Sequence, residues 1–274
     1  MTATAEARQP AEIKFVNPNT DNFDRNIRHA ATLGLPEVKP NTETGNKVVV
    51  VGSGPSLRLP ENQARLKELV DEGAKIFACK AAIKYIHDLG YKIDYAASMD
   101  PGSHIAQPKK IFRAPGVKHF IATSSDPALF NYLKKETVIL FNSACGLKNE
   151  LDLYRELFEN PVCVGGGFNV CNRAVTLCMY MDFKEIHLLG VDGGWKEGEP
   201  FYVDNTGPTV KKVTMHADLD GTRWFTAPDM LASCVAFARL YRENPGKLFF
   251  IGDTLPQYLK DKDNQFLDDC AKMG

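Results

Sequence analysis

The sequence predicts an α/β protein with a Rossmann-like, open and mostly parallel sheet that carries helices on both faces. From Lys47 onward, short apolar runs alternate with amphipathic stretches, which is typical of parallel strands joined by crossover helices. Glycine-rich turns precede two of the helical stretches. The chain has 274 residues, which is enough to bury one substantial core.

The expected strands are short runs dominated by apolar residues. They cover residues 47–52, 75–80, 94–100, 118–124, 137–142, 185–192 and 247–253. The expected helices follow an amphipathic pattern. They cover residues 61–73, 81–90, 126–135, 168–182 and 228–244, with a further helix-like segment at 21–35. Strands in this number predict one large sheet.

One face of the helix expected at 168–182 is apolar. Its members are Val170, Ala174, Leu177, Cys178 and Met181. Because these side chains recur at helical spacing, we expect this face to pack on the sheet.

The pattern also divides the chain into regions. Residues 1–46 are polar and rich in Asn, Thr and Pro, which indicates an N-terminal arm or cap. Residues 47–274 are expected to form one Rossmann-like, nucleotide-binding transferase domain. Within it, residues 193–226 hold no long apolar run and are interpreted as a long loop insertion over one edge of the sheet, and loops of this length are usually functional or disordered.

Composition excludes several classes of protein. Lys and Arg number 33 against 34 Asp and Glu, so a net charge of −1 gives no long-range attraction for nucleic acid, and no non-specific nucleic-acid binding is expected. No apolar run approaches the roughly 20 residues that span a bilayer. The N-terminus lacks the pattern of a secretory signal, so a cytoplasmic location is expected. The seven cysteines form no CxxC pair, which argues against a zinc knuckle and favours buried thiols.

The first glycine-rich turn lies between the first strand and the next helix, in VVVVGSGPSLRLPEN. Backbone N–H groups and the helix dipole hold anions at such a turn, so a phosphate site is the natural hypothesis. Gly52 and Gly54 permit a tight turn and close backbone approach. Ser53, Pro55 and Ser56 complete it, and Ser56 can cap the next segment or donate to a phosphate oxygen. The alternative is a plain tight turn.

Three familiar nucleotide-binding families do not match this turn. The dinucleotide fingerprint needs GxGxxG and an acidic residue about 20 positions later, but GSGPSL lacks the third glycine and the second strand ends in Cys79 and Lys80. This disfavours NAD and S-adenosylmethionine, whereas Lys80 suits a phosphate. The chain contains neither GKS nor GKT, so it has no Walker A loop.

A second glycine-rich turn, Gly165–Gly167, precedes the helix expected at 168–182. Gly166 and Gly167 let a bulky ligand approach the backbone, and Asn169 and Asn172 on the first helical turn can reach a base, ribose or phosphate. The alternative is close packing of helix and sheet.

Asp100 and Asp192 each end an expected strand. Asp100 and Asp192 would therefore lie at the carboxyl edge of the sheet, where open α/β sheets bind ligands. Either could hold Mg²⁺ that bridges phosphates, or accept a hydrogen bond from a sugar or acceptor hydroxyl. The alternative for Asp100 is an ordinary turn or helix-capping aspartate.

The insertion at 193–226 supplies further candidates. Trp195 and Tyr202 are aromatic residues in a polar loop beside Asp192, a combination common in sugar-binding sites. His216 is the best candidate for a general base, and the alternative is a structural histidine. Lys211 and Lys212 either neutralise phosphate or form a solvated charge pair.

The order VVVGSGPSL, DYAASMDP and GGGFNVCNRAVTLCMYMDFKEIHLLGVDGGW resembles a known superfamily over about residues 47–253. It unites the 6-hydroxymethylpterin diphosphokinase MptE-like proteins with the motility accessory factors, which act as flagellin glycosyltransferases. Short stand-alone members occur in phage genomes. The same blocks are distantly similar to the bacterial family 42 sialyltransferases, although Ser53 and Lys80 stand where those enzymes tend to carry asparagine.

The resemblance implies a role for each matching position. Phosphates or ribose would lie on Gly52–Ser56, and Gly166, Gly167 and Asn169 would complete the nucleotide pocket. Asp100 and Asp192 would lie at the reacting end. In the sialyltransferase pattern, Tyr202 would assist the leaving phosphate and His216 would take the acceptor proton.

The leading hypothesis is a glycosyltransferase that uses a nucleotide-sugar donor and an acceptor that the sequence does not identify. One alternative is a diphosphokinase that uses ATP and Mg²⁺ and acts on a pterin-like hydroxymethyl group, with Asp100 and Asp192 as metal ligands. Another is a non-catalytic nucleotide-binding or assembly protein. A small-molecule nucleotide is the expected partner.

Overall fold

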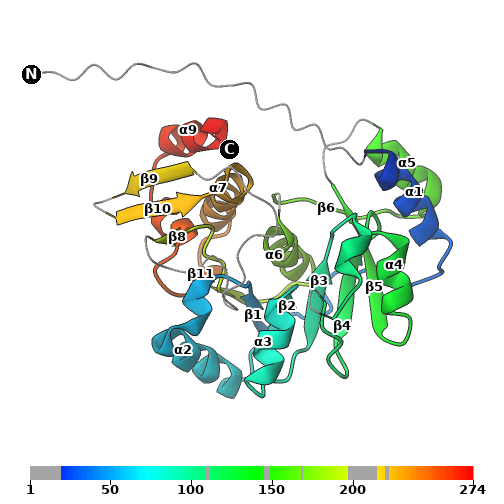
Figure 1. Ribbon diagram of the computed structural model, residues 1–274, viewed down its shortest axis with the longest axis horizontal. Coiled ribbons are helices and arrows are strands. Elements are labelled where there is room, and N and C mark those ends of the chain that lie inside the picture. The colour runs from blue at the N-terminus through cyan, green and yellow to red at the C-terminus, as the bar shows by residue number, and fades with distance from the viewer. Residues whose placement is uncertain are drawn as a thin grey trace, which may run out of the picture.

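The computed structural model describes residues 20–108, 111–144, 149–167, 169–196, 215–219 and 222–273. Its centre is an eight-stranded sheet with the strand order β11-β7-β1-β2-β3-β4-β5-β6. Every neighbouring pair in this sheet is parallel. Helices lie on both faces (Figure 1), which confirms the predicted Rossmann-like α/β class.

All seven runs predicted as strands are strands of this sheet. They are β1 (Lys47–Val51), β2 (Lys75–Cys79), β3 (Tyr95–Ser98), β4 (Lys118–Ala122), β5 (Thr137–Ser143), β7 (Glu185–Leu189) and β11 (Leu248–Phe250). The eighth strand, β6 (Cys163–Val164), was not expected because two residues are too few to show a strand pattern.

The strand order contains one reversal. The chain adds β2 to β6 successively on one side of β1, and β7 then pairs with the other side of β1. The connections therefore diverge between β1 and β7, and open α/β sheets bind ligands outside the carboxyl ends of the strands at such a point.

Both faces of the sheet are buried under helices. Val49 and Val51 pack into a core cluster that includes residues of α2 (Pro60–Asp71), α3 (Ala82–Asp88) and α4 (Pro127–Tyr132). Val48 and Val50 point to the opposite face, which is covered by α6 (Val170–Tyr180) and by Phe237 of α7 (Pro228–Glu243). A strand that is buried on both faces has a continuous run of apolar residues in its sequence. This is why KVVVV could be predicted as a strand.

The apolar face predicted for α6 packs on the sheet. Its five members are all buried, and α6 contacts β1, β2 and β3. The prediction for this helix is confirmed.

The described part of the N-terminal region, residues 20–46, packs against the sheet domain. Helix α1 (Thr20–Ala31) contacts α4 and α5 (Glu150–Leu157), and Ile27 is buried. The Val38 N–H donates to the Leu140 carbonyl at 2.9 Å. The segment expected to be an arm or cap is thus joined to the core through side chains and backbone.

The insertion contains a second, antiparallel sheet that the sequence did not reveal. Its order is β8-β10-β9, made of β8 (Trp195–Lys196), β9 (Met215–Leu219) and β10 (Thr222–Thr226). It lies beside α7 and α9 (Asn264–Met273) in Figure 1. Residues of β10, α7, α8 (Leu255–Leu259) and α9 form one buried apolar cluster. In the described part of the chain, no helix combines the length and apolarity needed to cross a membrane.

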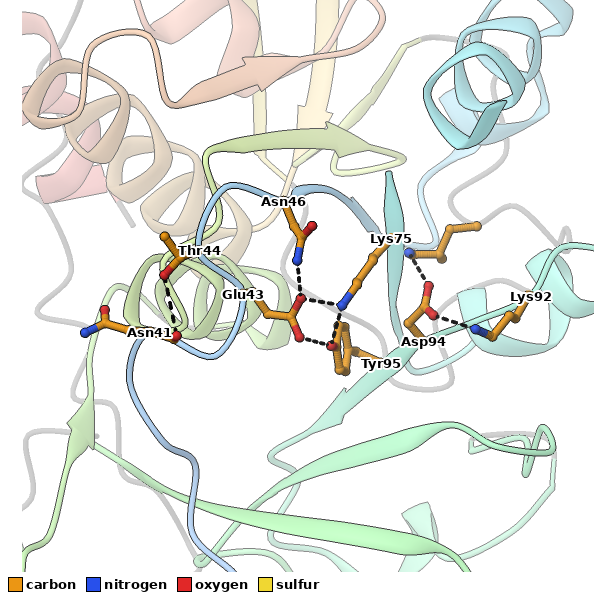
Figure 2. Close-up of polar contacts among 9 residues, drawn as sticks. Asn41, Glu43, Thr44, Asn46, Lys75, Lys92, Asp94 and Tyr95 are labelled. Atoms are coloured by element: carbon orange, nitrogen blue, oxygen red, sulfur yellow. Dashed lines mark hydrogen bonds and ion pairs between the residues drawn. The ribbon is translucent and has the colours of Figure 1, made fainter. Parts of the chain in front are cut away.

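A polar cluster closes the opposite, amino edge of the main sheet (Figure 2). We call Glu43, Asn46, Lys75 and Tyr95 the amino-edge cluster. The buried Glu43 carboxylate accepts hydrogen bonds from the Tyr95 hydroxyl, from the Lys75 ammonium group and, at 2.9 Å, from the Asn46 amide. Burial alone would raise the pKa of Glu43, but the hydrogen bonds from Lys75 and Tyr95 outweigh it and hold that pKa below its usual value.

Candidate functional site

A cleft of about 280 Å³ opens at the carboxyl ends of β1 and β7. It lies at the reversal point of the strand order, where the fold is expected to bind a ligand. Its walls come from the turn after β1, the ends of β2 and β3, the turn after β7 and the first turns of α6 and α7. The lining residues predicted as site residues are Ser53, Gly54, Pro55, Lys80, Asn169 and Asp192.

The turns after β1 and β7 touch each other through their backbones. The N–H of Gly54 donates to the Gly190 carbonyl at 2.8 Å, and the N–H of Gly52 donates to the Leu189 carbonyl at 2.8 Å. A Cβ on Gly54 would lie 2.5 Å from the Asp192 carboxylate, and one on Gly52 would collide with the Gly190 carbonyl. Glycine is therefore required at both positions by the sheet itself, whether or not a ligand is bound.

The Asp192 side chain binds the turn after β1 through two hydrogen bonds from Ser56. Its Oδ2 accepts the Ser56 N–H at 2.7 Å, and its Oδ1 accepts the Ser56 hydroxyl. Ser56 lies in the short 3₁₀ helix η1 (Pro55–Arg58), so this carboxylate satisfies an N-terminal donor of that helix. Asp192 is buried and also lines the cleft. Its catalytic and metal-binding roles stay predictions, and a ligand would meet a carboxylate already bound to Ser56.

Lys80 lies in the cleft with an unusual backbone conformation. Its φ angle is +50°, in the left-handed region that long side chains rarely adopt. Its Nζ lies 3.4 Å from Oδ2 of Asp100. Its phosphate-binding role stays a prediction.

Asp100 lies directly beside the cleft, since its neighbour Met99 is a lining residue. Its Oδ1 accepts the Gly102 N–H at 3.1 Å, which is the turn arrangement considered as the alternative. Its Oδ2 faces Lys80 and lies 3.6 Å from Nε2 of His104. Asp100 is therefore a turn residue that also faces the Lys80 ammonium group and the His104 imidazole, and its catalytic and metal roles stay predictions.

The start of α6 faces the cleft. Asn169 is the N-cap residue, and its side chain accepts the Asn172 N–H at 3.0 Å. Asn169, Val170 and Cys171 line the cleft, so the N-terminus of α6 directs its partial positive charge toward it. Asn172 itself is fully buried and donates to the Ser233 carbonyl at 3.2 Å, so it ties α6 to α7.

The glycines before α6 have a structural explanation. Gly166 and Gly167 have φ angles of +103° and +133°. A Cβ on Gly166 would collide with the Thr176 hydroxyl, and one on Gly167 would lie 2.6 Å from the Asn172 side chain. Neither glycine lines the cleft. The geometry favours the alternative of close packing, and a role in binding the nucleotide stays a prediction for both.

The insertion brings aromatic residues near the rim. Trp195 stacks on Phe225 with ring centroids 6.0 Å apart, and the preceding Gly193 and Gly194 line the cleft. His216 lies in β9, where its backbone pairs with Phe225. Its role as general base stays a prediction. The other candidates of this region, Tyr202, Lys211 and Lys212, lie outside the described residues.

The structure adds residues that the sequence did not suggest. Asp229, Met230 and Ser233 line the cleft from the first turns of α7. Proline at the start of a helix with an acidic residue in its first turn was the available signal, and it marked only a helix start. His104 was overlooked although it stands four residues after Asp100. Within the described ranges, no group of three or more His, Cys, Asp or Glu residues could hold a metal ion.

Fold and cleft together define a Rossmann-like α/β protein with a cleft at the switch point of a parallel sheet. Residues 20–198, more than half of the chain, match the family of 6-hydroxymethylpterin diphosphokinase MptE-like proteins, and the chain belongs to this family. The resemblance found in the sequence is thereby confirmed. No curated protein matches the sequence significantly.

A solved structure shares the fold. It is the MAf glycosyltransferase from Magnetospirillum magneticum AMB-1, with a TM-score of 0.61 and 17% sequence identity. The similarity covers 92% of this chain and 41% of the glycosyltransferase. The chain therefore corresponds to less than half of that larger protein.

Proposed function

We propose that the protein is a nucleotide-dependent group transferase, and more specifically a glycosyltransferase that uses a nucleotide-sugar donor. Membership of the MptE-like family and the fold shared with a MAf glycosyltransferase support a transferase-type function. The observation that carries the proposal is the cleft at the switch point, with Lys80 and the N-terminus of α6 both facing it.

The cleft offers two groups that attract a phosphate, although the carboxylates of Asp192 and Asp229 also line it. Lys80 supplies a full positive charge, and the N-terminus of α6 supplies a partial one. Ser53 on the turn after β1 adds a hydroxyl. The cleft volume of about 280 Å³ is close to the lower end of the range found for small-molecule sites.

The same arrangement suits the chemistry of glycosyl transfer. When the bond between the sugar and the phosphate breaks, negative charge develops on the departing phosphate. Lys80 would neutralise that charge in a site already arranged for it, which is the usual source of electrostatic catalysis. The aromatic pair Trp195 and Phe225 at the rim would give the sugar an apolar surface.

The diphosphokinase that uses ATP and Mg²⁺ is the second candidate, and the name of the family favours it. In that reaction Asp100 and Asp192 would serve as metal ligands. To do so, Asp100 would have to exchange its contacts with Lys80 and His104, and Asp192 its hydrogen bonds with Ser56. Mg²⁺ prefers several oxygen ligands and retains water, so this exchange is a specific requirement of the second candidate.

A thermal-shift screen separates the candidates. The ligands are CMP, UDP, GDP, their sugar conjugates and ATP, each with and without Mg²⁺. We expect one nucleotide and its sugar conjugate to raise the melting temperature more than ATP does, because binding stabilises the folded state by mass action. Stabilisation by ATP with Mg²⁺ alone would favour the diphosphokinase. No response to any nucleotide would contradict both and favour an assembly protein.

Two lysine variants show whether binding occurs in the cleft. Lys80→Met should abolish most of the nucleotide-induced shift. Lys84→Met removes an exposed lysine that pairs with Asp88 on α3, and it should leave the shift unchanged. Equal shifts in both variants would place the nucleotide elsewhere.

A further inference from the structure

One histidine shares the carboxylate of Asp100 with the lysine of the cleft. We propose that His104 is the general base that takes the proton from the acceptor hydroxyl, and that Asp100 is the positioning residue that orients it. This inference rests on the proposed transferase function and deepens it. It assigns Asp100 to a histidine instead of to a metal ion.

The three side chains are arranged from the cleft outward. Lys80 lines the cleft, and its Nζ lies 3.4 Å from Oδ2 of Asp100. Nε2 of His104 lies 3.6 Å from the same oxygen. The Asp100 side chain is 21% exposed and that of His104 is 65% exposed. An acceptor arriving from solvent would therefore meet His104 beside the residue that holds the phosphate.

The turn that carries His104 is fixed at several points. Ile105 is buried in the core beneath it. The Gly102 N–H binds Oδ1 of Asp100 at 3.1 Å, and the Pro101 carbonyl accepts a hydrogen bond at 3.3 Å from the buried Asn26 of α1. A general base needs this kind of rigid support, because small errors in its position reduce proton transfer.

Gly102 also controls access to the imidazole. A Cβ at this position would lie 2.5 Å from Nδ1 of His104. Any larger residue at this position would thus crowd Nδ1 or displace the imidazole ring.

These contacts give the two ring nitrogens different roles. With Nε2–H directed at Asp100, Nδ1 carries the lone pair that accepts a proton. The acceptor hydroxyl gives its proton to Nδ1, and its oxygen forms the new bond to the sugar carbon. The bond from that carbon to the phosphate oxygen breaks, and its electron pair leaves with the nucleotide phosphate, which faces Lys80. Asp100 stabilises the imidazolium, as the carboxylate does in a catalytic triad.

His104 and His216 are rival candidates for one role. The described contacts give His104 an orienting carboxylate and a link to the cleft through Lys80. His216 was predicted only from its place in the insertion and from the sialyltransferase pattern. Single variants of the two histidines decide between them.

The test uses the full-length chain and the nucleotide sugar that stabilises it most in the thermal-shift screen. Water replaces the unidentified acceptor, and the release of free nucleotide is measured. We expect His104→Ala to reduce turnover 10²- to 10³-fold, in the range of general base catalysis, and to bind the nucleotide within twofold of the unmodified protein. Added imidazole should restore part of the activity in this variant.

Two further variants test the surroundings of His104. Asp100→Asn should lower kcat at least tenfold and change KM for the nucleotide sugar much less, although the contact of Asp100 with Lys80 is also weakened. Gly102→Ala should act like His104→Ala by obstructing Nδ1. The matched control is His87→Ala, since Nδ1 of His87 lies 3.8 Å from Asp88 on α3 and forms a histidine–aspartate pair outside the cleft. It should leave turnover unchanged.

The outcomes separate the two proposals. Turnover of His104→Ala within threefold of the unmodified protein, or loss of turnover in His216→Ala alone, overturns the role of His104 and leaves the transferase proposal intact. A protein that binds no nucleotide, or that releases none from any nucleotide sugar, overturns the glycosyltransferase proposal and this inference together.

Discussion

Each edge of the main sheet carries a carboxylate paired with a lysine, but one pair is enclosed by further hydrogen bonds and the other borders a cleft. At the amino edge, Glu43 is buried and takes direct hydrogen bonds from Lys75, Tyr95 and Asn46 (Figure 2). At the carboxyl edge, Asp100 faces Lys80 at 3.4 Å beside an open cleft.

Exposure of the lysines does not explain the difference. The side chains of Lys75 and Lys80 are 32% and 36% exposed, whereas those of Glu43 and Asp100 are 8% and 21% exposed. The carboxylate at the amino edge is satisfied on every side and stabilises the fold. The carboxylate at the carboxyl edge holds Lys80 at longer range and leaves that lysine able to meet a ligand.

Removal of the buried carboxylate should show the largest effect. Glu43→Ala leaves Lys75 and the Tyr95 hydroxyl without their shared acceptor, and breaking such a pair should lower the free energy of unfolding by about 3 kcal/mol. Urea denaturation measures this change. Asp100→Ala, at the partly exposed pair, should cost less than about 1 kcal/mol. If both variants lost the same free energy of unfolding, the amino-edge carboxylate would not be more important for stability than Asp100.

His119 is the opposite case to Glu43, because Nε2 of this buried residue of β4 has no hydrogen-bond partner. Burial lowers the pKa of His119 from 6.5 to about 4. The folded state therefore binds this proton less well than the unfolded state does. The contribution of the neutral His119 to the free energy of unfolding is complete above pH 6.5 and is lost as the pH falls from 6.5 to about 4. The expected loss between pH 7 and pH 4.5 is about 2 kcal/mol.

Urea titrations at several pH values test this expectation. His119→Gln should flatten that part of the pH dependence, whereas His29→Gln, on α1, serves as the control and should preserve it. An unchanged slope in His119→Gln would show that another group titrates.

Gly54→Ala tests how tightly the carboxyl edge is packed. The added Cβ would lie 2.5 Å from the Asp192 carboxylate and 2.8 Å from the Gly190 carbonyl, so overpacking should cost about 1 to 2 kcal/mol. Gly165→Ala is a matched control, because its Cβ would find its first neighbour only at 3.9 Å. Thermal unfolding compares the two. A Gly54→Ala protein as stable as Gly165→Ala would mean that the turn can shift.

The smallest effect concerns the strained backbone of Lys80. Lys80→Gly and Lys80→Met both remove the ammonium group and should both lose nucleotide binding. Only glycine adopts a φ of +50° without steric strain, so Lys80→Gly should be more stable than Lys80→Met by up to about 1 kcal/mol. Equal stability would show that the conformation costs little.

The sequence predicts well what depends on local pattern. The run KVVVV and the apolar face of α6 carry strong periodic signals, and both elements appear where they were expected. The turn at Gly52 and Gly54 is also predicted locally, because two glycines directly follow an apolar run. In contrast, β8, β9 and β10 lie in a polar stretch, and β6 has only two residues, so neither gave a usable pattern.

Contacts between distant residues were not predictable in this way. Glu43 meets Lys75 and Tyr95 across 32 and 52 positions, and Ser56 meets Asp192 across 136. The contact between Asp100 and His104 is local, but it depends on how the turn at Gly102 is folded. The sequence thus indicated the edge of the sheet that holds the site but not which side chains share a partner there.

Asn26 has a practical consequence for work with this protein. Its amide donates to the Ser124 carbonyl at 2.9 Å and to the Pro101 carbonyl at 3.3 Å, so helix α1 helps to fix the turn that carries Asp100 and His104. Shortened versions of the chain that begin after α1 would lose these hydrogen bonds while keeping every strand of the sheet.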